Sequence, residues 1–175
     1  HCGDCNRDIG DIMSKLLATV FGVGYLKPAP GTWGSLAALP LFWVIHVYLG
    51  GPWAALLATI AVTLIGWWAI NRATEGADNH DPSEIVIDEV AGQWVALLPV
   101  SFGAAAMGVG VLDLYPGWIA GFILFRLFDI WKPGPVGWAD RRNDAFGVMF
   151  DDIIAGVLAA VVMMILAGIS HGFFV

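Results

Sequence analysis

The stretch from Trp53 to Asn71 contains no charged side chain and is long enough to cross a membrane as one helix. Inside lipid, only a helix or a closed barrel satisfies every backbone hydrogen bond. No part of the sequence alternates polar and apolar residues over the length that barrel strands need. The composition agrees, since 58% of the 175 residues are hydrophobic and 13% are charged, about half the charged share of a typical soluble domain. The sequence therefore predicts an all-α membrane protein.

Other apolar segments are also candidates for the bilayer: Ser35–Leu49, Val90–Ala106, Gly117–Trp131 and Ile153–Ile169. The segment Ile12–Val23 is too short to span comfortably and is expected to lie at the interface or to re-enter. We predict a polytopic helix bundle of about four spanning helices plus this short N-terminal interfacial or re-entrant helix. Residues 12–175 are expected to form one domain. Residues 1–11 are expected to be a disordered or cloning-derived tail, although Cys2 and Cys5 form a C-x-x-C pattern.

The placement of charge predicts the orientation in the membrane. If the turn Gly50–Pro52 faces outward, all eight cations fall on the inner side, as the positive-inside rule requires. These cations are Arg7, Lys15, Lys27, Arg72, Arg126, Lys132, Arg141 and Arg142. Of the 15 acidic residues, only Asp113 falls outside. The polar chemistry is therefore predicted to be cytoplasmic, and the net charge of −7 argues against a nucleic-acid partner.

Carboxylates crowd the entry to the segment Val90–Ala106. Asp81, Glu84, Asp88 and Glu89 occur within HDPSEIVIDEVAG. If a helix begins near Ser83, Glu84 and Asp88 share one of its faces. Acids are also common in solvated loops and at helix N-termini. Their crowding against an apolar segment favours a functional site.

Two further polar groups border apolar segments. Asp151 and Asp152 directly precede Ile153–Ile169, and an N-cap role explains one of them better than both. Arg126, Asp129 and Lys132 recur every three residues, which places them roughly along one helix face. An ion-paired structural patch is the plain alternative, but charges at membrane depth are usually functional.

The donor atoms in these groups are oxygens, which suit a hard cation such as Mg²⁺ or Mn²⁺. The histidines offer no convincing zinc site. Mg²⁺ in proteins prefers one or two carboxylates plus substrate phosphate, which indicates phosphoryl chemistry. The loop from Tyr25 to Ser35 could meet an anion, because Gly31 and Gly34 allow close backbone approach. Thr32 and Ser35 add hydroxyl groups there, and Lys27 adds a cation.

Four segments in order resemble the phosphatidylglycerophosphatase A family: KPAPGTWGSLAALP (27–40), HDPSEIVIDEVAG (80–92), FRLFDIWKPGPV (125–136) and FGVMFDDIIAG (146–156). The resemblance covers nearly the whole chain after the first dozen residues. It implies a bacterial, Mg²⁺-dependent integral membrane phosphatase of phospholipid biosynthesis. Such an enzyme converts phosphatidylglycerol phosphate to phosphatidylglycerol and inorganic phosphate at the cytoplasmic face of the inner membrane.

Residue roles follow from combining the resemblance with the clusters above. The expected metal ligands are Asp81, Asp88, Glu89, Asp129, Asp151 and Asp152. The expected catalytic residues are Asp88, Asp129, Lys132 and Arg126. The expected substrate-binding residues are Lys27, Thr32, Ser35, Arg126, Lys132 and Arg142. Attack by a metal-activated water and a phospho-enzyme formed on Asp129 or Asp88 both remain open.

The leading alternative function is a transporter component for a small ion or solute with a cytoplasmic acidic metal site. A transporter usually carries a charge near the middle of a span. The centres of these segments lack charge, apart from His46, which can be neutral. A lipid phosphatase is therefore the preferred interpretation. Its expected partners are the phospholipid substrate and the bilayer, with a homo-oligomer as a further expectation.

Overall fold

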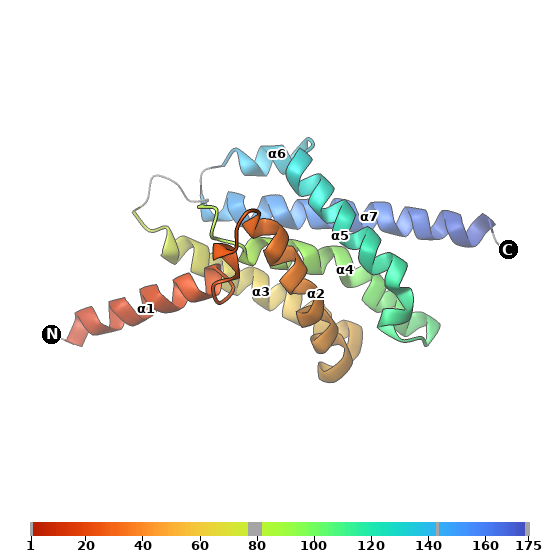
Figure 1. Ribbon diagram of the computed structural model, residues 1–175, viewed down its shortest axis with the longest axis horizontal. Coiled ribbons are helices and arrows are strands. Elements are labelled where there is room, and N and C mark those ends of the chain that lie inside the picture. Colours follow the sequence, from red (N-terminus) through yellow and green to blue (C-terminus); the bar gives the residue numbers. More distant parts are fainter. Residues whose placement is uncertain (1, 77–81, 143, 174–175) are drawn as a thin grey trace.

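The computed structural model describes residues 2–76, 82–142 and 144–173, and these residues form helices and turns without strands. Figure 1 shows the helices packed as one elongated bundle. The elements are α1 (Cys2–Ala18), η1 (Val23–Tyr25), α2 (Pro30–Leu49), α3 (Gly51–Ala73), α4 (Ile87–Met107), η2 (Val111–Leu114), α5 (Tyr115–Trp131), α6 (Pro135–Asp140) and α7 (Ala145–Phe173).

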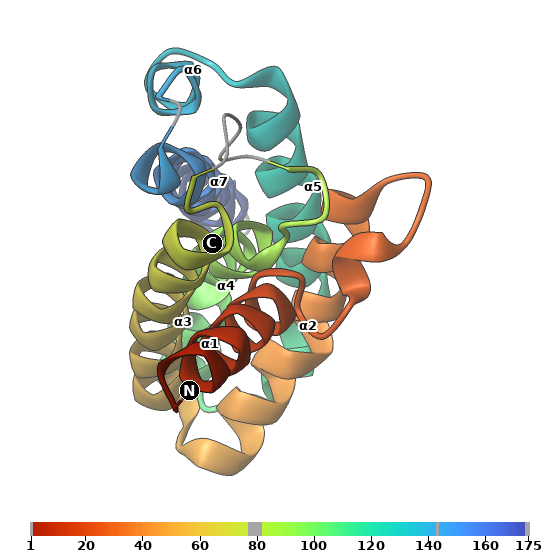
Figure 2. The ribbon, with the colours of Figure 1, turned by 90° about the vertical axis from the view of Figure 1, so that its left-hand side faces the viewer.

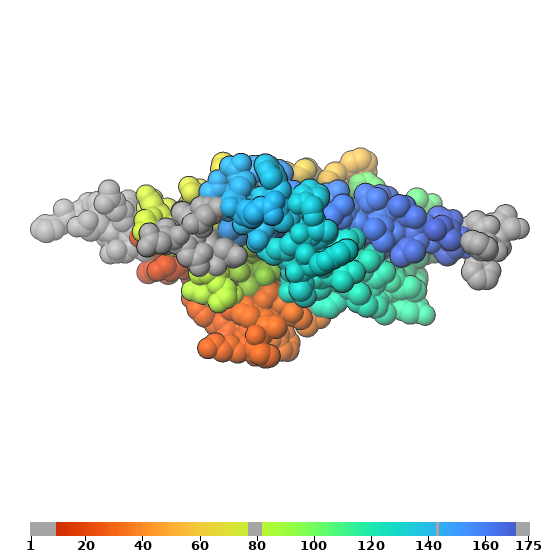
Figure 3. Space-filling model, turned by 90° about the horizontal axis from the view of Figure 1, so that it is seen from above, coloured from red at the N-terminus to blue at the C-terminus, as the bar shows by residue number. Residues whose placement is uncertain are grey.

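The predicted all-α membrane bundle is confirmed. Five helical segments of the described chain have the length and apolar composition to cross a bilayer: α2, α3, α4, η2 with α5, and α7. Helix α2 is longer than the segment expected from the sequence because it begins at Pro30, and proline is well tolerated at a first helical position. Helix α7 extends along one side of the molecule beyond its neighbours (Figures 1 and 3).

Helix α4 is the centre of the bundle. Figure 2, which looks along the bundle from the end where α4 begins, shows α4 surrounded by α2, α3, α5 and α7, and α4 packs against all four. In the apolar stretch of α4 that could cross the bilayer, 56% of the residues are buried inside the protein. The buried share is at most 28% in each of the other spanning segments. Side chains carried on α4 are therefore sheltered by protein, while the other spanning helices keep a broad apolar face for lipid.

Helices α4 and α7 approach each other through glycine. A Cβ atom built on Gly156 of α7 would lie within 3.0 Å of the carbonyl oxygen of Gly92. One built on Gly92 would lie 2.5 Å from the carbonyl oxygen of Asp152. Small residues allow this close approach, which is a common way to pack helices in a bilayer where lipid removes the hydrophobic drive.

Helix α2 is fixed to α4 by two polar contacts. The indole nitrogen of Trp94 donates to the carbonyl oxygen of Ala38 at 2.9 Å. Farther along both helices, Nδ1 of His46 and Oγ of Ser101 lie 2.6 Å apart. The two contacts hold α2 beside α4, with the start of each helix at the same end of the bundle.

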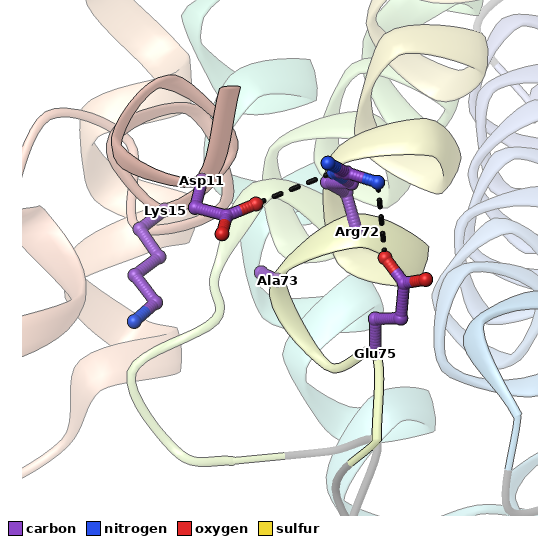
Figure 4. Close-up of a pocket in the computed structure, with 5 residues that line it drawn as sticks. All are labelled: Asp11, Lys15, Arg72, Ala73 and Glu75. Atoms are coloured by element: carbon purple, nitrogen blue, oxygen red, sulfur yellow. Dashed lines mark hydrogen bonds and ion pairs between the residues drawn. The ribbon is translucent and has the colours of Figure 1, made fainter. Parts of the chain in front are cut away.

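Helix α1 begins at Cys2 and so includes residues 2–11, for which the sequence predicted a disordered or cloning-derived tail. With 17 residues it is shorter than each of the five spanning segments, and it packs on α3. Arg72 at the end of α3 forms an ion pair with Asp11 of α1 at 3.3 Å and with Glu75 at 3.1 Å (Figure 4). The chain turns after Ala18, whose carbonyl oxygen accepts a 2.9 Å hydrogen bond from the backbone N–H of Val86.

That last contact explains a wrong helix boundary. The sequence suggested a helix start near Ser83, but α4 begins at Ile87. Ile85 is buried in the same apolar cluster as Ala18. Val86 is also buried, and its backbone, with φ of −142° and ψ of 9°, is not helical. Glu84 therefore precedes the helix and does not share a helical face with Asp88.

We expect Gly156→Ala to destabilise the bundle, because the added methyl group would force α7 away from α4. Overpacking of this kind costs about 1–3 kcal/mol, which lowers the thermal midpoint in detergent by roughly 3–10 °C. Gly168→Ala is the matched control on the same helix, because no atom lies within 4 Å of its Cβ position. Equal midpoints for the two variants would contradict the close α4–α7 contact.

Candidate active site

Three carboxylates meet where the start of α4 lies beside the second turn of α7. Asp88 and Glu89 lie in the first turn of α4, and Asp152 lies in α7. One oxygen from each side chain can be chosen so that all three atoms lie within 4.8 Å of one another. Asp88 and Asp152 are buried, with 6% and 3% of their surface exposed. We refer to these three residues as the carboxylate cluster.

The position of Asp152 corrects the sequence analysis. Helix α7 begins at Ala145, well before the expected start at Ile153. Asp144 occupies the capping position instead, because its Oδ1 accepts a 2.7 Å hydrogen bond from the N–H of Gly147. Asp151 and Asp152 are therefore inside the helix, where capping cannot explain them. Burying such charges is costly unless a partner compensates them.

Helix α5 brings Arg126 and Asp129 to the carboxylate cluster. Nη1 of Arg126 lies 2.8 Å from Oδ2 of Asp129, an ion pair at the predicted spacing of three residues. Asp129 is close enough for its negative charge to repel those of Asp152 and Glu89. The positive charge of Arg126 attracts Glu89. Arg126 thus provides positive charge beside an otherwise acidic group.

The start of α2 completes the site. A Cβ atom built on Gly31 would lie within 3.0 Å of Oε1 of Glu89 and 3.2 Å from Nη1 of Arg126. Only a glycine leaves room for both side chains at this point. Ser35, one turn later, donates to the carbonyl oxygen of Gly31 at 2.9 Å and lies 3.5 Å from Nη1 of Arg126. Two predicted substrate-binding residues, Ser35 and Arg126, are therefore in contact.

Lys132 has a different position from the one predicted. Helix α5 ends at Trp131, and Lys132 adopts a left-handed conformation with φ of +48°. It therefore leaves the face that carries Arg126 and pairs with Asp151 at 2.9 Å and with Asp140 of α6. Burial alone would lower the pKa of Lys132, but hydrogen bonds to Asp140 and Asp151 outweigh burial and raise it above its ordinary value. Asp140 was not anticipated, because nothing in the sequence links it to Lys132.

The other predicted residues are less closely connected. Thr32 is half-buried and follows Gly31, while Lys27 is exposed in the loop before α2. Arg142 is exposed, pairs with Asp144 at 2.9 Å and lies over the ring of Phe146. Asp81 falls outside the described residues. The roles assigned to these residues stay predictions.

Two of the atoms at the site are buried polar atoms without a hydrogen-bond partner. They are Oε2 of Glu89 and Nε of Arg126. Buried polar groups are nearly always paired, so such atoms need a specific explanation. An acceptor of this kind next to two buried carboxylates suits a hard divalent cation, and an unpaired guanidinium N–H suits an anion such as phosphate. The donor set therefore fits Mg²⁺ and a phosphate group together.

The bundle and the carboxylate cluster define the class of the protein. It is a polytopic membrane protein with an acidic, arginine-containing site at one end of the bundle, near the termini of its helices. The chain belongs to the phosphatidylglycerophosphatase A family, whose model matches residues 16–167. It is therefore an enzyme, a phosphatase, and the alternative of a transporter component is not favoured.

Curated relatives agree with the family assignment. The phosphatidylglycerophosphatase A of Escherichia coli K12 is 38% identical over 148 residues, which cover 83% of this chain and 78% of the relative. That of Haemophilus influenzae Rd is 37% identical over 150 residues, covering 85% of each chain. A protein of Bacteroides thetaiotaomicron named a putative phosphatidylinositol-3-phosphatase is 38% identical over 155 residues, covering 86% and 91%. No solved structure matches the chain significantly.

We expect Gly31→Ala to lower phosphatase activity by roughly 100-fold, the effect of displacing catalytic groups by about 1 Å. The methyl group would displace Glu89 or Arg126, and the side chains can move without unfolding the bundle. Gly103→Ala is the control, because its nearest neighbour would be 3.7 Å away, an ordinary contact. Steady-state phosphate release, together with the thermal midpoint of each variant, checks this prediction. Full activity of Gly31→Ala would show that the α2 start is not part of the site.

Proposed function

We propose that this enzyme hydrolyses phosphatidylglycerol phosphate to phosphatidylglycerol and inorganic phosphate, as a step of phospholipid biosynthesis, and that it depends on Mg²⁺. The observation that carries the proposal is the buried carboxylate cluster beside Arg126 and the start of α2. The names of two relatives support this substrate. The third relative is named for a different lipid phosphate, so the experiment below compares the two substrates.

The depth of the site supports a substrate held in the bilayer. Asp88 and Glu89 lie in the first turn of a membrane-spanning helix, and Asp129 lies near the end of another. Such positions are close to the membrane surface, where a lipid phosphate group resides. A phosphomonoester could reach the carboxylate cluster while its acyl chains stay in the hydrocarbon.

The residues of the site have complementary roles in this proposal. Asp88, Glu89 and Asp152 would hold the cation, while Arg126 and backbone N–H groups at the start of α2 would bind phosphate oxygens. Bound Mg²⁺ supplies charge neutralisation and lowers the pKa of a water molecule. In the overall reaction the oxygen of water bonds to phosphorus, the bond from phosphorus to the headgroup oxygen breaks, and that oxygen takes up a proton.

Two residues act indirectly in this proposal. Asp129 orients Arg126 through their 2.8 Å ion pair, and Lys132 balances the charge of Asp151 at 2.9 Å. A carboxylate already engaged with Arg126 is a poorer nucleophile, so the pairing favours attack by water over a phospho-enzyme on Asp129.

The proposed location is the bacterial inner membrane with the site facing the cytoplasm. The cations flanking the described spans, such as Lys27, Arg72 and Lys132, occur at the same end as the carboxylate cluster. The positive-inside rule then orients that end toward the cytoplasm. A homo-oligomer stays a prediction, which the mass of the detergent-solubilised protein would test.

We expect Asp88→Asn and Asp152→Asn each to lower phosphate release from phosphatidylglycerol phosphate by roughly 100-fold or more, because each removes a charged ligand of the cation. Removing Mg²⁺ with a chelator should abolish wild-type activity, and adding Mg²⁺ should restore it. Phosphatidylinositol 3-phosphate, assayed in parallel, should be the poorer substrate. Sealed inverted vesicles should hydrolyse added substrate, whereas right-side-out vesicles should require permeabilisation.

Asp113→Asn is the matched control, since Asp113 is the acidic residue on the short η2 element at the opposite end of the bundle. It should keep full activity. Unchanged activity in Asp88→Asn or Asp152→Asn, or full activity in chelator, would contradict the proposed site.

A further inference from the structure

Gln93 is a polar side chain buried among membrane helices without a hydrogen-bond partner. It has 0% of its surface exposed, and neither Oε1 nor Nε2 has a partner. Burying an amide is unfavourable unless it is paired. The residues that take part in the proposed reaction do not include Gln93, so its place in the bundle needs a separate explanation.

Gln93 lies directly below the carboxylate cluster. It is four residues after Glu89 on α4, so the two side chains share a helix face about 6 Å apart along the axis. In the described chain, the buried side-chain atoms without partners belong to Glu89, Gln93 and Arg126 alone. Gln93 therefore lies one helical turn farther into the bundle than Glu89, and both side chains carry a buried polar atom without a partner.

Contacts on either side of Gln93 show which helices it faces. Trp94 bonds to Ala38 of α2 at 2.9 Å. Leu97 and the carbonyl oxygen of Ala96 lie next to Gly121 of α5. Gln93 is thus directed at the seam between α2 and α5. The contact of Ser35 with Arg126 lies in the same seam.

The chemistry of an amide restricts what can satisfy Gln93. Oε1 accepts a hydrogen bond and Nε2 donates up to two. A phosphate oxygen would satisfy only the donor, and a metal ion only the acceptor. A hydroxyl group can do both, because its oxygen accepts and its proton is donated.

The direction into the membrane identifies which hydroxyl group this could be. With the phosphomonoester at the carboxylate cluster, the rest of the lipid must extend from the phosphate toward the bilayer. The part of the lipid directly attached to this phosphate is the headgroup alcohol. Gln93 is on that membrane side of the cluster, since α4 starts at the cluster and runs inward.

We propose that the Gln93 amide binds a free hydroxyl of the headgroup alcohol and thereby selects lipids whose phosphorylated headgroup carries one. This inference rests on the proposed function, and it adds a specificity-determining residue to it. A site built to hydrogen-bond a hydroxyl discriminates against the analogue that lacks it, because the amide is then left unpaired.

The test compares two lipid phosphates that differ in one hydroxyl. The first is phosphatidylglycerol phosphate, and the second has propane-1,3-diol phosphate as its headgroup in place of glycerol phosphate. Wild type should show a kcat/KM about tenfold higher for the first, which is the worth of about one hydrogen bond. Gln93→Met should lose about tenfold on the first lipid and stay within about twofold on the second.

Two further variants keep the result clear. Gln93→Leu should behave as Gln93→Met does, and neither should lower the thermal midpoint, because an apolar side chain removes the unpaired amide. Thr59→Val removes a buried hydroxyl that donates a 2.8 Å hydrogen bond within α3. This control should leave kcat/KM unchanged on both lipids.

Three results would overturn the inference: no preference in wild type, no loss in the Gln93 variants, or an equal loss on both lipids, which would indicate a bound water instead. If wild type releases phosphate from neither lipid, the proposed function fails as well. Activity on both lipids with an unaffected Gln93→Met variant defeats only the present inference.

Discussion

The structure depends on bringing like charges together inside a membrane bundle. Asp88 and Glu89 from α4 and Asp152 from α7 are held within 4.8 Å of one another. Carboxylates repel, so this arrangement exists only because the helices are fixed by other contacts. The backbones of α4 and α7 meet at Gly92 and Gly156, next to Asp152 itself. Packing at the glycine contact thus holds the carboxylates together against their repulsion. A bound cation would remove that repulsion, so the repulsion favours cation binding.

Positive side chains compensate the carboxylates only in part. Arg126 is shared between Asp129 and the carboxylate cluster, and Lys132 is shared between Asp151 and Asp140. Each of these basic side chains is thus already paired with an aspartate, so the three acids of the carboxylate cluster outnumber the positive charge beside them. A divalent cation would satisfy that excess and the unpaired oxygen of Glu89. The same site leaves a guanidinium N–H of Arg126 for a phosphate group.

Much of this architecture could be predicted from the sequence, because lipid imposes strong rules. The uncharged stretch Trp53–Asn71 is part of α3, and Asp88, Glu89 and Asp152 were recognised as acids next to apolar segments. Helix ends were harder. Nothing in FGVMFDD distinguishes a loop from a first helical turn, so the cap at Asp144 and the burial of Asp152 were missed.

Features that depend on three-dimensional neighbours could not be predicted. Lys132 turns away from α5 because of its left-handed backbone, and its contact with Asp140 depends on the placement of α6. Gly31 was recognised as a place of close backbone approach, but its neighbours, Glu89 and Arg126, were not. Gln93 looks like an ordinary polar residue in the sequence, and only its complete burial without a partner makes it notable.

If the carboxylate cluster is one divalent-cation site, the enzyme should bind such a cation, and measuring that binding does not rely on activity. Mn²⁺ titrated into the detergent-solubilised enzyme and followed by electron paramagnetic resonance should bind at about one ion per chain and be displaced by Mg²⁺. Asp152→Asn should weaken this binding by about tenfold or more, as expected for loss of a charged ligand. Undiminished binding in Asp152→Asn, or no saturable binding in wild type, would contradict the claim.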